Sequence, residues 1–144
     1  MIRRGVYVLF LRFGGPVETE AGALGHISLP AGDYCYVGSA MGGLDQRVSR
    51  HLSFEKNKRW HIDNLTIICR DMHALEHEGT SISECDLGRI VAEAGGEPAV
   101  DGFGCSDCNC QTHLFRVDWE RAERVLKDRG LVVFTDKRLS PEEK

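Results

Sequence analysis

The stretch GDYCYVGSAMGGLDQRVSRHL, Gly32 to Leu52, combines the patterns of a strand, a glycine-rich turn and a helix. Tyr34 and Tyr36 stand at alternate positions, which is typical of a strand with one aromatic face. Apolar residues then recur every four positions, the stripe of an amphipathic helix, at Leu44, Val48 and Leu52. The pattern fits a site that holds a phosphate beside a cationic helix. It equally fits an ordinary strand–turn–helix connection with a solvated helix face.

The flanking sequence predicts an α+β domain with a central, mainly antiparallel three-stranded sheet flanked by helices. β-Branched and aromatic residues indicate the first strand at Gly5–Phe13. The segments His26–Leu29 and Tyr34–Ser39 are expected to form a hairpin across the turn PAGD, and they supply the other two strands.

Further strands and helices are expected beyond the first helix. Ser81 precedes Glu84 by three residues, the spacing of a capping box, and predicts a helix that ends at the Gly95–Gly96 pair. Asp118 is placed to cap a later helix. The remaining segments are a short helix and three strands, expected at Trp60–Leu65, Thr66–Glu78, Thr112–Val117 and Leu131–Thr135.

Length and composition favour a single domain. The chain has 144 residues, of which 42% are hydrophobic, enough for one core. One domain is expected over residues 1–138, followed by a flexible tail at 139–144. No run approaches the ~20 apolar residues of a membrane helix, and Arg12 interrupts the apolar stretch near the N-terminus, which fits a strand better than a signal peptide. A cytoplasmic protein without membrane contact is therefore expected.

Charge is distributed unevenly along the chain, whose net charge is -4. Residues 47–70 hold six Lys/Arg and two Asp/Glu, whereas residues 71–104 hold eight Asp/Glu and one Arg. A domain polarised in this way can present a basic face to nucleic acid despite its acidic total. An ordinary charged surface gives the same counts.

The tripeptides GVY at 5–7 and YVG at 36–38 resemble the two half-motifs of the GIY-YIG nuclease superfamily. Later residues resemble the superfamily's Arg-x-x-x-His helix and its metal-binding glutamate, at Arg47, His51 and Glu84. The core resemblance spans residues 4–95, and the remaining motifs resemble a small, largely archaeal subgroup without an assigned substrate. The resemblance implies a GIY-YIG-like fold and a divalent-metal-dependent DNA endonuclease, with DNA repair as the process in which it would act.

The resemblance also implies roles for single residues. Glu84 would bind Mg²⁺ or Mn²⁺, a role that competes with a place in the helix cap. Tyr36 is favoured over Tyr7 as the group that takes a proton from water, which requires a phenol pKa well below about 10. Arg47 offers a planar fork for the scissile phosphate, and His51 would bind phosphate or share a proton with a tyrosine. Further substrate contacts are expected from Gly38, Ser39, Arg50, Lys56, Lys58 and Arg59.

Two departures from the superfamily pattern favour an alternative function. Ser39 stands where many relatives have a lysine, and the segment GGEP at 95–98 stands where an asparagine is often found. Asn64 and Asn109 are substitutes between which the sequence does not distinguish. The alternative is a nucleic-acid-binding module of the same fold with little or no catalytic activity.

Cys105, Cys108, Cys110 and His113 form a second cluster, Cys-x2-Cys-x-Cys-x2-His. Four soft ligands suit Zn²⁺, but four ligands so close in sequence would strain the backbone. Reduced thiols in a loop near the active site, and a disulfide or redox pair, are the other interpretations. A zinc or thiol protein is therefore a third function class. The other cysteines are expected to be small core residues, at Cys35, Cys69 and Cys85.

Overall fold

The computed structural model describes residues 2–54, 56–58, 60–105 and 110–138. Within these residues, a six-stranded antiparallel sheet has the order β6-β7-β4-β1-β5-β8, and β2 pairs with β3 in a second sheet. The strands are β1 (Gly5–Phe13), β2 (Val17–Glu20), β3 (His26–Leu29), β4 (Gly32–Ala40), β5 (Asp71–Glu78), β6 (Glu97–Pro98), β7 (Leu114–Arg116) and β8 (Val132–Val133). The helices are α1 (Leu44–His51), α2 (Asp63–Thr66), α3 (Glu84–Glu93), α4 (Trp119–Asp128) and a 3-10 turn, η1 (Gly22–Leu24). The predicted α+β class is confirmed.

The predicted three-stranded sheet is wrong in one strand, because β3 pairs with β2 and not with β4. The ladder between β1 and β4 ends at Phe13 and Gly32. Pro16 and Pro30 lie between this ladder and the one formed by β2 and β3, and proline has no backbone N–H to donate to a ladder. PAGD is therefore an interruption within one long hairpin rather than the turn between two paired strands. β5 is the strand that completes the centre of the sheet beside β1.

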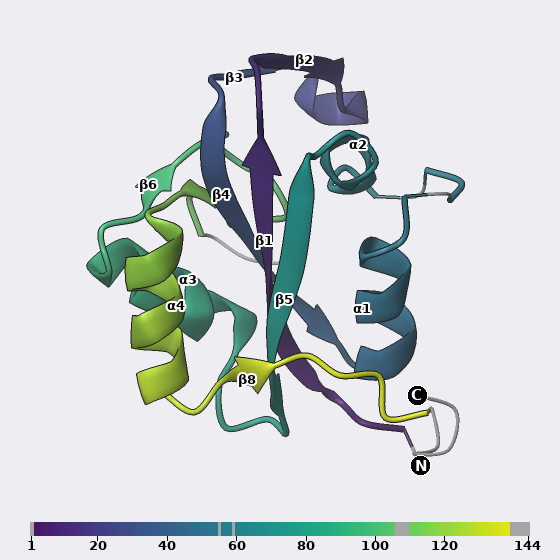
Figure 1. The fold of residues 1–144 in the computed structure, drawn as a ribbon, viewed down its shortest axis with the longest axis vertical. Helices are drawn as coiled ribbons and strands as arrows, with labels where there is room; N and C mark the ends of the chain where they lie inside the picture. Colours follow the sequence, from purple (N-terminus) through teal and green to yellow (C-terminus); the bar gives the residue numbers. More distant parts are fainter. Residues whose placement is uncertain (1, 55, 59, 106–109, 139–144) are drawn as a thin grey trace.

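β1 lies in the middle of the sheet and contributes side chains to a hydrophobic core on each face. Tyr7, Leu9 and Leu11 pack with residues of α1 and α2, whereas the residues between them pack with α3 and α4. Figure 1 shows these two pairs of helices on opposite sides of the sheet. The apolar stripe predicted for α1 faces the first core, since Leu44 and Val48 are fully buried. Among the described helices, none is long and apolar enough to cross a membrane.

Arg3 fixes the start of α1 against the sheet. Its guanidinium lies 2.5 Å from Asp45 on α1 and 2.5 Å from Glu76 on β5, and its carbonyl accepts a hydrogen bond from the Leu44 amide. The hydrogen bond from Arg3 holds the pKa of Asp45 below its usual value. The side chains that follow on α1 are thereby held in place relative to β1.

α3 begins two residues later than the predicted capping box. Ser83 Oγ accepts a hydrogen bond from the Asp86 amide, and the Asp86 carboxylate accepts one from the Ser83 amide, each at 3.0 Å. The predicted pair of Ser81 and Glu84 is therefore wrong, and Glu84 is the first residue of the helix, outside the cap. Asp118 caps α4 as predicted.

Candidate active site

Five residues that the sequence singles out line one pocket of about 210 Å³: Tyr7, Tyr36, Arg47, His51 and Glu84. They come from β1, β4, α1 and the first turn of α3. The two tyrosines lie on the same face of the sheet. Tyr36 is directly opposite Leu9 in the ladder, and Leu9 points to the same face as Tyr7 because the two are two residues apart on β1. The pocket also includes Gly38, Ser39, Trp60 and Ile62.

The pocket forms where the edge of β4 is uncovered. β7 pairs with β4 from Tyr34 to Tyr36, and the His113 carbonyl then accepts a hydrogen bond from the Val37 amide. Among the described residues, the last part of β4 pairs with β1 alone. Glu84 can therefore approach the open edge from α3, and side chains from both faces of the sheet meet there.

Tyr7 and His51 form a buried hydrogen-bonded pair in the pocket wall. Tyr7 Oη is 2.9 Å from His51 Nε2, and the exposed fractions of the two residues are 2% and 1%. Gly38 is opposite Tyr7 on β4, and a Cβ at Gly38 would lie 2.5 Å from the Tyr7 ring. Glycine is needed at this position because the Tyr7 ring occupies the space that a Cβ would take.

Burial determines the protonation of these side chains. It raises the pKa of both Tyr7 and Tyr36 above the ordinary value, although the Arg47 charge opposes the change. Burial also lowers the pKa of His51 to about 3, helped by the Lys56 charge and opposed by a carboxylate of α2. Near neutral pH the histidine is therefore uncharged and both phenols are protonated. Burial thus shifts both phenols away from the lowered pKa that a tyrosine base requires.

We expect the free energy of unfolding to decrease as the pH falls from 6.5 towards about 3, in part because of His51. In that range the unfolded chain binds a proton on this histidine and the folded protein does not. The stability contributed by this group is therefore complete above its ordinary pKa, and is lost on acidification at up to about 1.4 kcal/mol per pH unit.

Urea unfolding of the parent protein and of His51→Gln across this pH range measures the contribution. The substitution removes the titrating group, so the variant should show a shallower decrease between the two pKa values and the same slope as the parent above them. Parallel curves throughout the range would contradict the prediction.

Glu84 is held by two neighbouring side chains instead of by the helix cap. Its Oε2 accepts a hydrogen bond from Ser39 Oγ at 2.7 Å, and its Oε1 lies 2.6 Å from His113 Nδ1. Burial alone would raise the pKa of Glu84, but the hydrogen bonds from His113 and Ser39, with the Arg47 charge, outweigh it and lower the pKa. An ionised carboxylate oriented in this way fits a ligand for Mg²⁺ or Mn²⁺ whose other ligands are water molecules. Ser39, which replaces the expected lysine, serves to orient Glu84.

Arg47 is fixed beside the pocket by its own contacts. Its Nη1 donates a hydrogen bond to the Ser39 carbonyl at 2.7 Å, and its Cζ lies 4.9 Å from the centroid of the Trp60 ring. A guanidinium has five N–H donors, so a fork held by one of them can still bind the oxygens of a phosphate.

The other predicted substrate-binding cations have different surroundings. Arg50 forms a bidentate ion pair with the fully buried Asp63, at 2.9 and 3.0 Å. Lys56 Nζ donates hydrogen bonds to two backbone carbonyls at the end of α1. Both charges therefore contact protein atoms instead of lining the pocket. Lys58 is exposed, and Arg59 lies outside the described residues.

The structure divides the predicted cysteine cluster. Cys110 Sγ is 2.9 Å from Cys85 Sγ, and a ring nitrogen of His113 lies within 4.8 Å of both sulfurs. The prediction that Cys85 is a core residue is wrong, because it is half-buried at the start of α3. Cys105 lines a neighbouring pocket, and Cys108 lies outside the described residues. The other two cysteines are buried as predicted, at Cys35 and Cys69.

Sequence reasoning missed one residue that lines the pocket, Trp60, and a buried residue that contacts it, Asp63. Trp60 contacts two guanidinium groups, since the Cζ atoms of Arg50 and Arg47 lie 4.6 and 4.9 Å from the centroid of its ring. Asp63 accepts a hydrogen bond from the Trp60 amide at 3.0 Å in addition to the ion pair with Arg50. An acidic residue within the apolar pattern WHIDNL was the available signal. Asn64, one of the two candidate asparagines, donates a hydrogen bond to a backbone carbonyl of its own helical turn, and Asn109 is not among the described residues.

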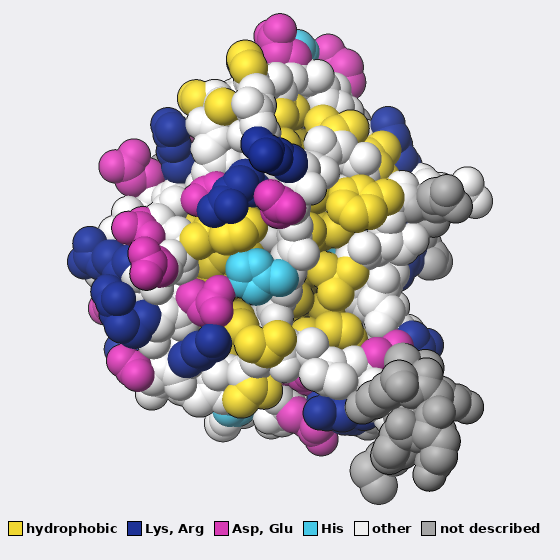
Figure 2. Space-filling view, in the orientation of Figure 1, with side chains coloured by type: hydrophobic (Ala, Val, Ile, Leu, Met, Phe, Trp, Pro, Cys, Tyr) yellow, Lys and Arg dark blue, Asp and Glu magenta, His cyan; other side chains and the backbone are white. Residues whose placement is uncertain are grey.

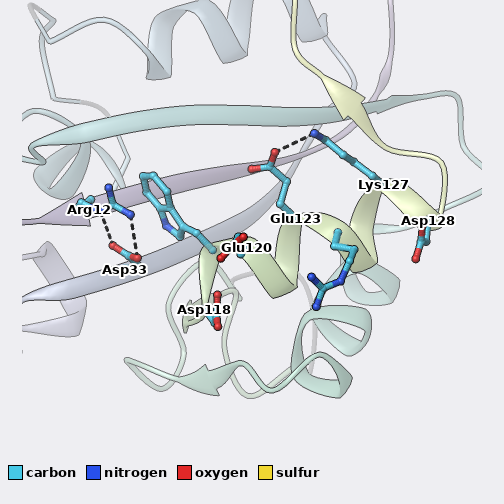
Figure 3. Close-up of a pocket in the computed structure, with 9 residues that line it drawn as sticks. Arg12, Asp33, Asp118, Glu120, Glu123, Lys127 and Asp128 are labelled. Carbon is cyan, nitrogen blue, oxygen red and sulfur yellow. Dashed lines mark hydrogen bonds and ion pairs between the residues drawn. The ribbon is translucent and has the colours of Figure 1, made fainter.

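A larger cavity, of about 700 Å³, lies on the α4 side of the sheet (Figure 3). Five of its nine lining residues are acidic, and ion pairs join Arg12 to Asp33 and Lys127 to Glu123. Figure 2, in the orientation that shows α4, has acidic and basic side chains interspersed. A phosphate has less favourable electrostatics in this cavity than in the smaller pocket beside Arg47.

Residues 6–131 match the family described as "Domain of unknown function DUF123". The match covers most of the chain, so the protein belongs to this family. No curated protein and no solved structure gives a significant match.

Proposed function

We propose that the protein is a divalent-metal-dependent endonuclease of the GIY-YIG type that hydrolyses phosphodiester bonds in DNA. The observation that supports this most directly is the convergence of five residues on one pocket: Tyr7, Tyr36, Arg47, His51 and Glu84. Groups that act on one phosphate must all come within a few ångströms of it. The antiparallel arrangement of β4, β1 and β5, with α1 packed beside them, is in keeping with a GIY-YIG-like fold.

In the proposed mechanism, Tyr7 and His51 take the proton from the attacking water. The phenol oxygen accepts this proton while the phenol passes its own proton to His51 Nε2, 2.9 Å away. The uncharged histidine has a lone pair for this purpose, and a bound phosphodiester adds negative charge that favours the imidazolium. This geometry supports Tyr7 as the proton acceptor, whereas the sequence favoured Tyr36.

The other groups stabilise charge in the transition state. Arg47 would bind non-bridging oxygens of the phosphate and neutralise the charge that develops on them. Glu84 would hold the divalent ion, which when bound supplies positive charge for the leaving oxygen. Tyr36, at the border of the pocket, would bind a phosphate oxygen or a water molecule through its hydroxyl.

A second pocket, of about 370 Å³, supports a nucleic acid as the substrate. It shares Tyr36, Trp60 and Ile62 with the first pocket, and rings of His61 and Phe103 complete its walls. Base–aromatic stacking is a common and sequence-tolerant way to hold a nucleotide of a single strand. A phosphate in the first pocket would thus have an aromatic pocket beside it for an adjacent base.

The test is a cleavage assay with branched repair intermediates, namely flaps and four-way junctions, and with supercoiled plasmid. We expect strand cleavage that requires Mg²⁺ or Mn²⁺ and stops when the metal is chelated. If neither metal supports cleavage of any substrate but the protein still binds these DNA substrates, the protein is a binding module. The replacement of lysine by Ser39 and the raised pKa of both tyrosines favour this alternative. If the protein neither cleaves nor binds any of the DNA substrates, the proposal is wrong.

A further inference from the structure

We infer that Cys85, Cys110 and His113 form a binding site for a thiophilic metal ion, with Zn²⁺ as the expected occupant. This site is separate from the proposed Mg²⁺ or Mn²⁺ position and does not depend on nuclease activity. Cys85 comes from α3, whereas Cys110 and His113 come from the segment that precedes β7. Cys85 is 25 residues before Cys110 in the sequence.

The positions of the three side chains meet the geometric requirement of a zinc site. One ligand atom from each residue lies within 4.8 Å of the others. Bond lengths of about 2.3 Å to sulfur and about 2.0 Å to nitrogen, at tetrahedral angles, place ligand atoms about 3.5–4 Å apart. The sulfurs of Cys85 and Cys110, 2.9 Å apart, would need to separate by about 1 Å to accommodate the ion. A water molecule or another ligand would complete the coordination.

The contact between His113 and Glu84 is an independent observation in favour of a metal. A histidine that binds a metal through one nitrogen usually donates its other N–H to a carboxylate, which fixes the tautomer and the orientation of the ring. His113 Nδ1 lies 2.6 Å from Glu84 Oε1, and the residue is 1% exposed. A carboxylate beside one ring nitrogen is the arrangement expected of a histidine that binds a metal through the other.

The position of Cys85 also favours a bound cation over a simple pair of thiols. Cys85 is the second residue of α3, and its sulfur lies 2.9 Å from that of Cys110, which comes from a segment 25 residues further along the chain. When both sulfurs bind a divalent cation as thiolates, the cation also balances their charges. Because Cys85 lies outside the cluster of residues 105–113, the proposed site does not require four ligands from one short segment.

Metal content tests the inference directly. Protein purified under reducing conditions, without a metal-binding affinity tag, should contain close to one zinc per chain by elemental mass spectrometry. Replacement of zinc by Co²⁺ should give the thiolate charge-transfer band and the intense visible absorption of a tetrahedral cobalt site. Cys85→Ser, Cys110→Ser and His113→Gln should each lose most of the bound metal and weaken these bands.

Cys69→Ser is the matched control. Cys69 is a buried cysteine in the core on the α1 side of the sheet, and its thiol donates a hydrogen bond to the carbonyl of Thr66. This variant should keep the metal of the parent protein. Circular dichroism of each variant separates loss of the site from loss of the fold, and a folded Cys85→Ser variant that keeps its full metal content would overturn the inference. A Cys85–Cys110 disulfide in freshly isolated protein, found by mass spectrometry after alkylation of free thiols, would also overturn it.

Discussion

Glu84→Gln is expected to reduce metal-dependent cleavage by on the order of 10²–10³-fold, the size of effect seen when one electrostatic stabiliser is removed from an active site. Glutamine has nearly the shape of glutamate and can still accept a hydrogen bond from Ser39, but it lacks the charge that binds Mg²⁺. The affinity for DNA should change little, because the ion stabilises charge that develops in the transition state.

The structure supplies a control for the stability of α3. Ser83 caps this helix and Glu84 does not, so Ser83→Ala should lower the free energy of unfolding by about 1 kcal/mol and leave cleavage by the folded protein unchanged. Cleavage rates and thermal midpoints of both variants should be measured in parallel. Parent-like cleavage by Glu84→Gln would exclude Glu84 as the metal ligand.

Tyr7→Phe is expected to reduce cleavage by about 10²–10⁴-fold, the usual contribution of a general acid–base group. Phenylalanine keeps the ring that packs over Gly38 and removes only the hydroxyl that bonds to His51. DNA binding should be retained, since in the proposed mechanism this hydroxyl transfers a proton and does not bind the phosphate.

Tyr36→Phe is the matched comparison, since it removes the other tyrosine hydroxyl of the same pocket. Its expected loss is about tenfold, the value of one ordinary hydrogen bond to the substrate. Single-turnover rates at saturating enzyme separate the chemical step from binding. A larger loss for Tyr36→Phe than for Tyr7→Phe would reverse the assignment and support the base that the sequence favoured.

Local patterns predicted those parts of the molecule that depend on neighbouring residues. The composition of β1, the alternate tyrosines of β4, the stripe of α1 and the Asp118 cap depend on residues close together in sequence, and the structure has the two strands, the helix and the cap that they predict. A spacing of three residues does not identify the cap of α3. Ser81 with Glu84 and Ser83 with Asp86 have the same spacing, but Ser83 and Asp86 form the cap while Glu84 contacts Ser39 and His113.

Contacts between distant segments could not be predicted from the sequence alone. The position of β3 depends on which strand pairs with it. The periodicity of its own sequence shows that it is a strand but does not say whether β2 or β4 is its partner. The apolar helix pattern around Cys85 predicts a core residue, whereas its sulfur lies beside that of Cys110, 25 residues further along the chain. The contact of His113 with Glu84 joins two motifs that the sequence offers as separate sites.

The central position of β1 has a consequence for the order of events during synthesis. β1 is translated before both of its partners and pairs with β4 and, much later in the sequence, with β5, so the sheet has a high contact order and should close slowly. The pairs that build the pocket are also distant, with Tyr7 and His51 44 residues apart and Ser39 and Glu84 45 residues apart. A nascent chain therefore has no assembled pocket until α3 has been translated, and a chain that ends before α3 lacks the proposed site.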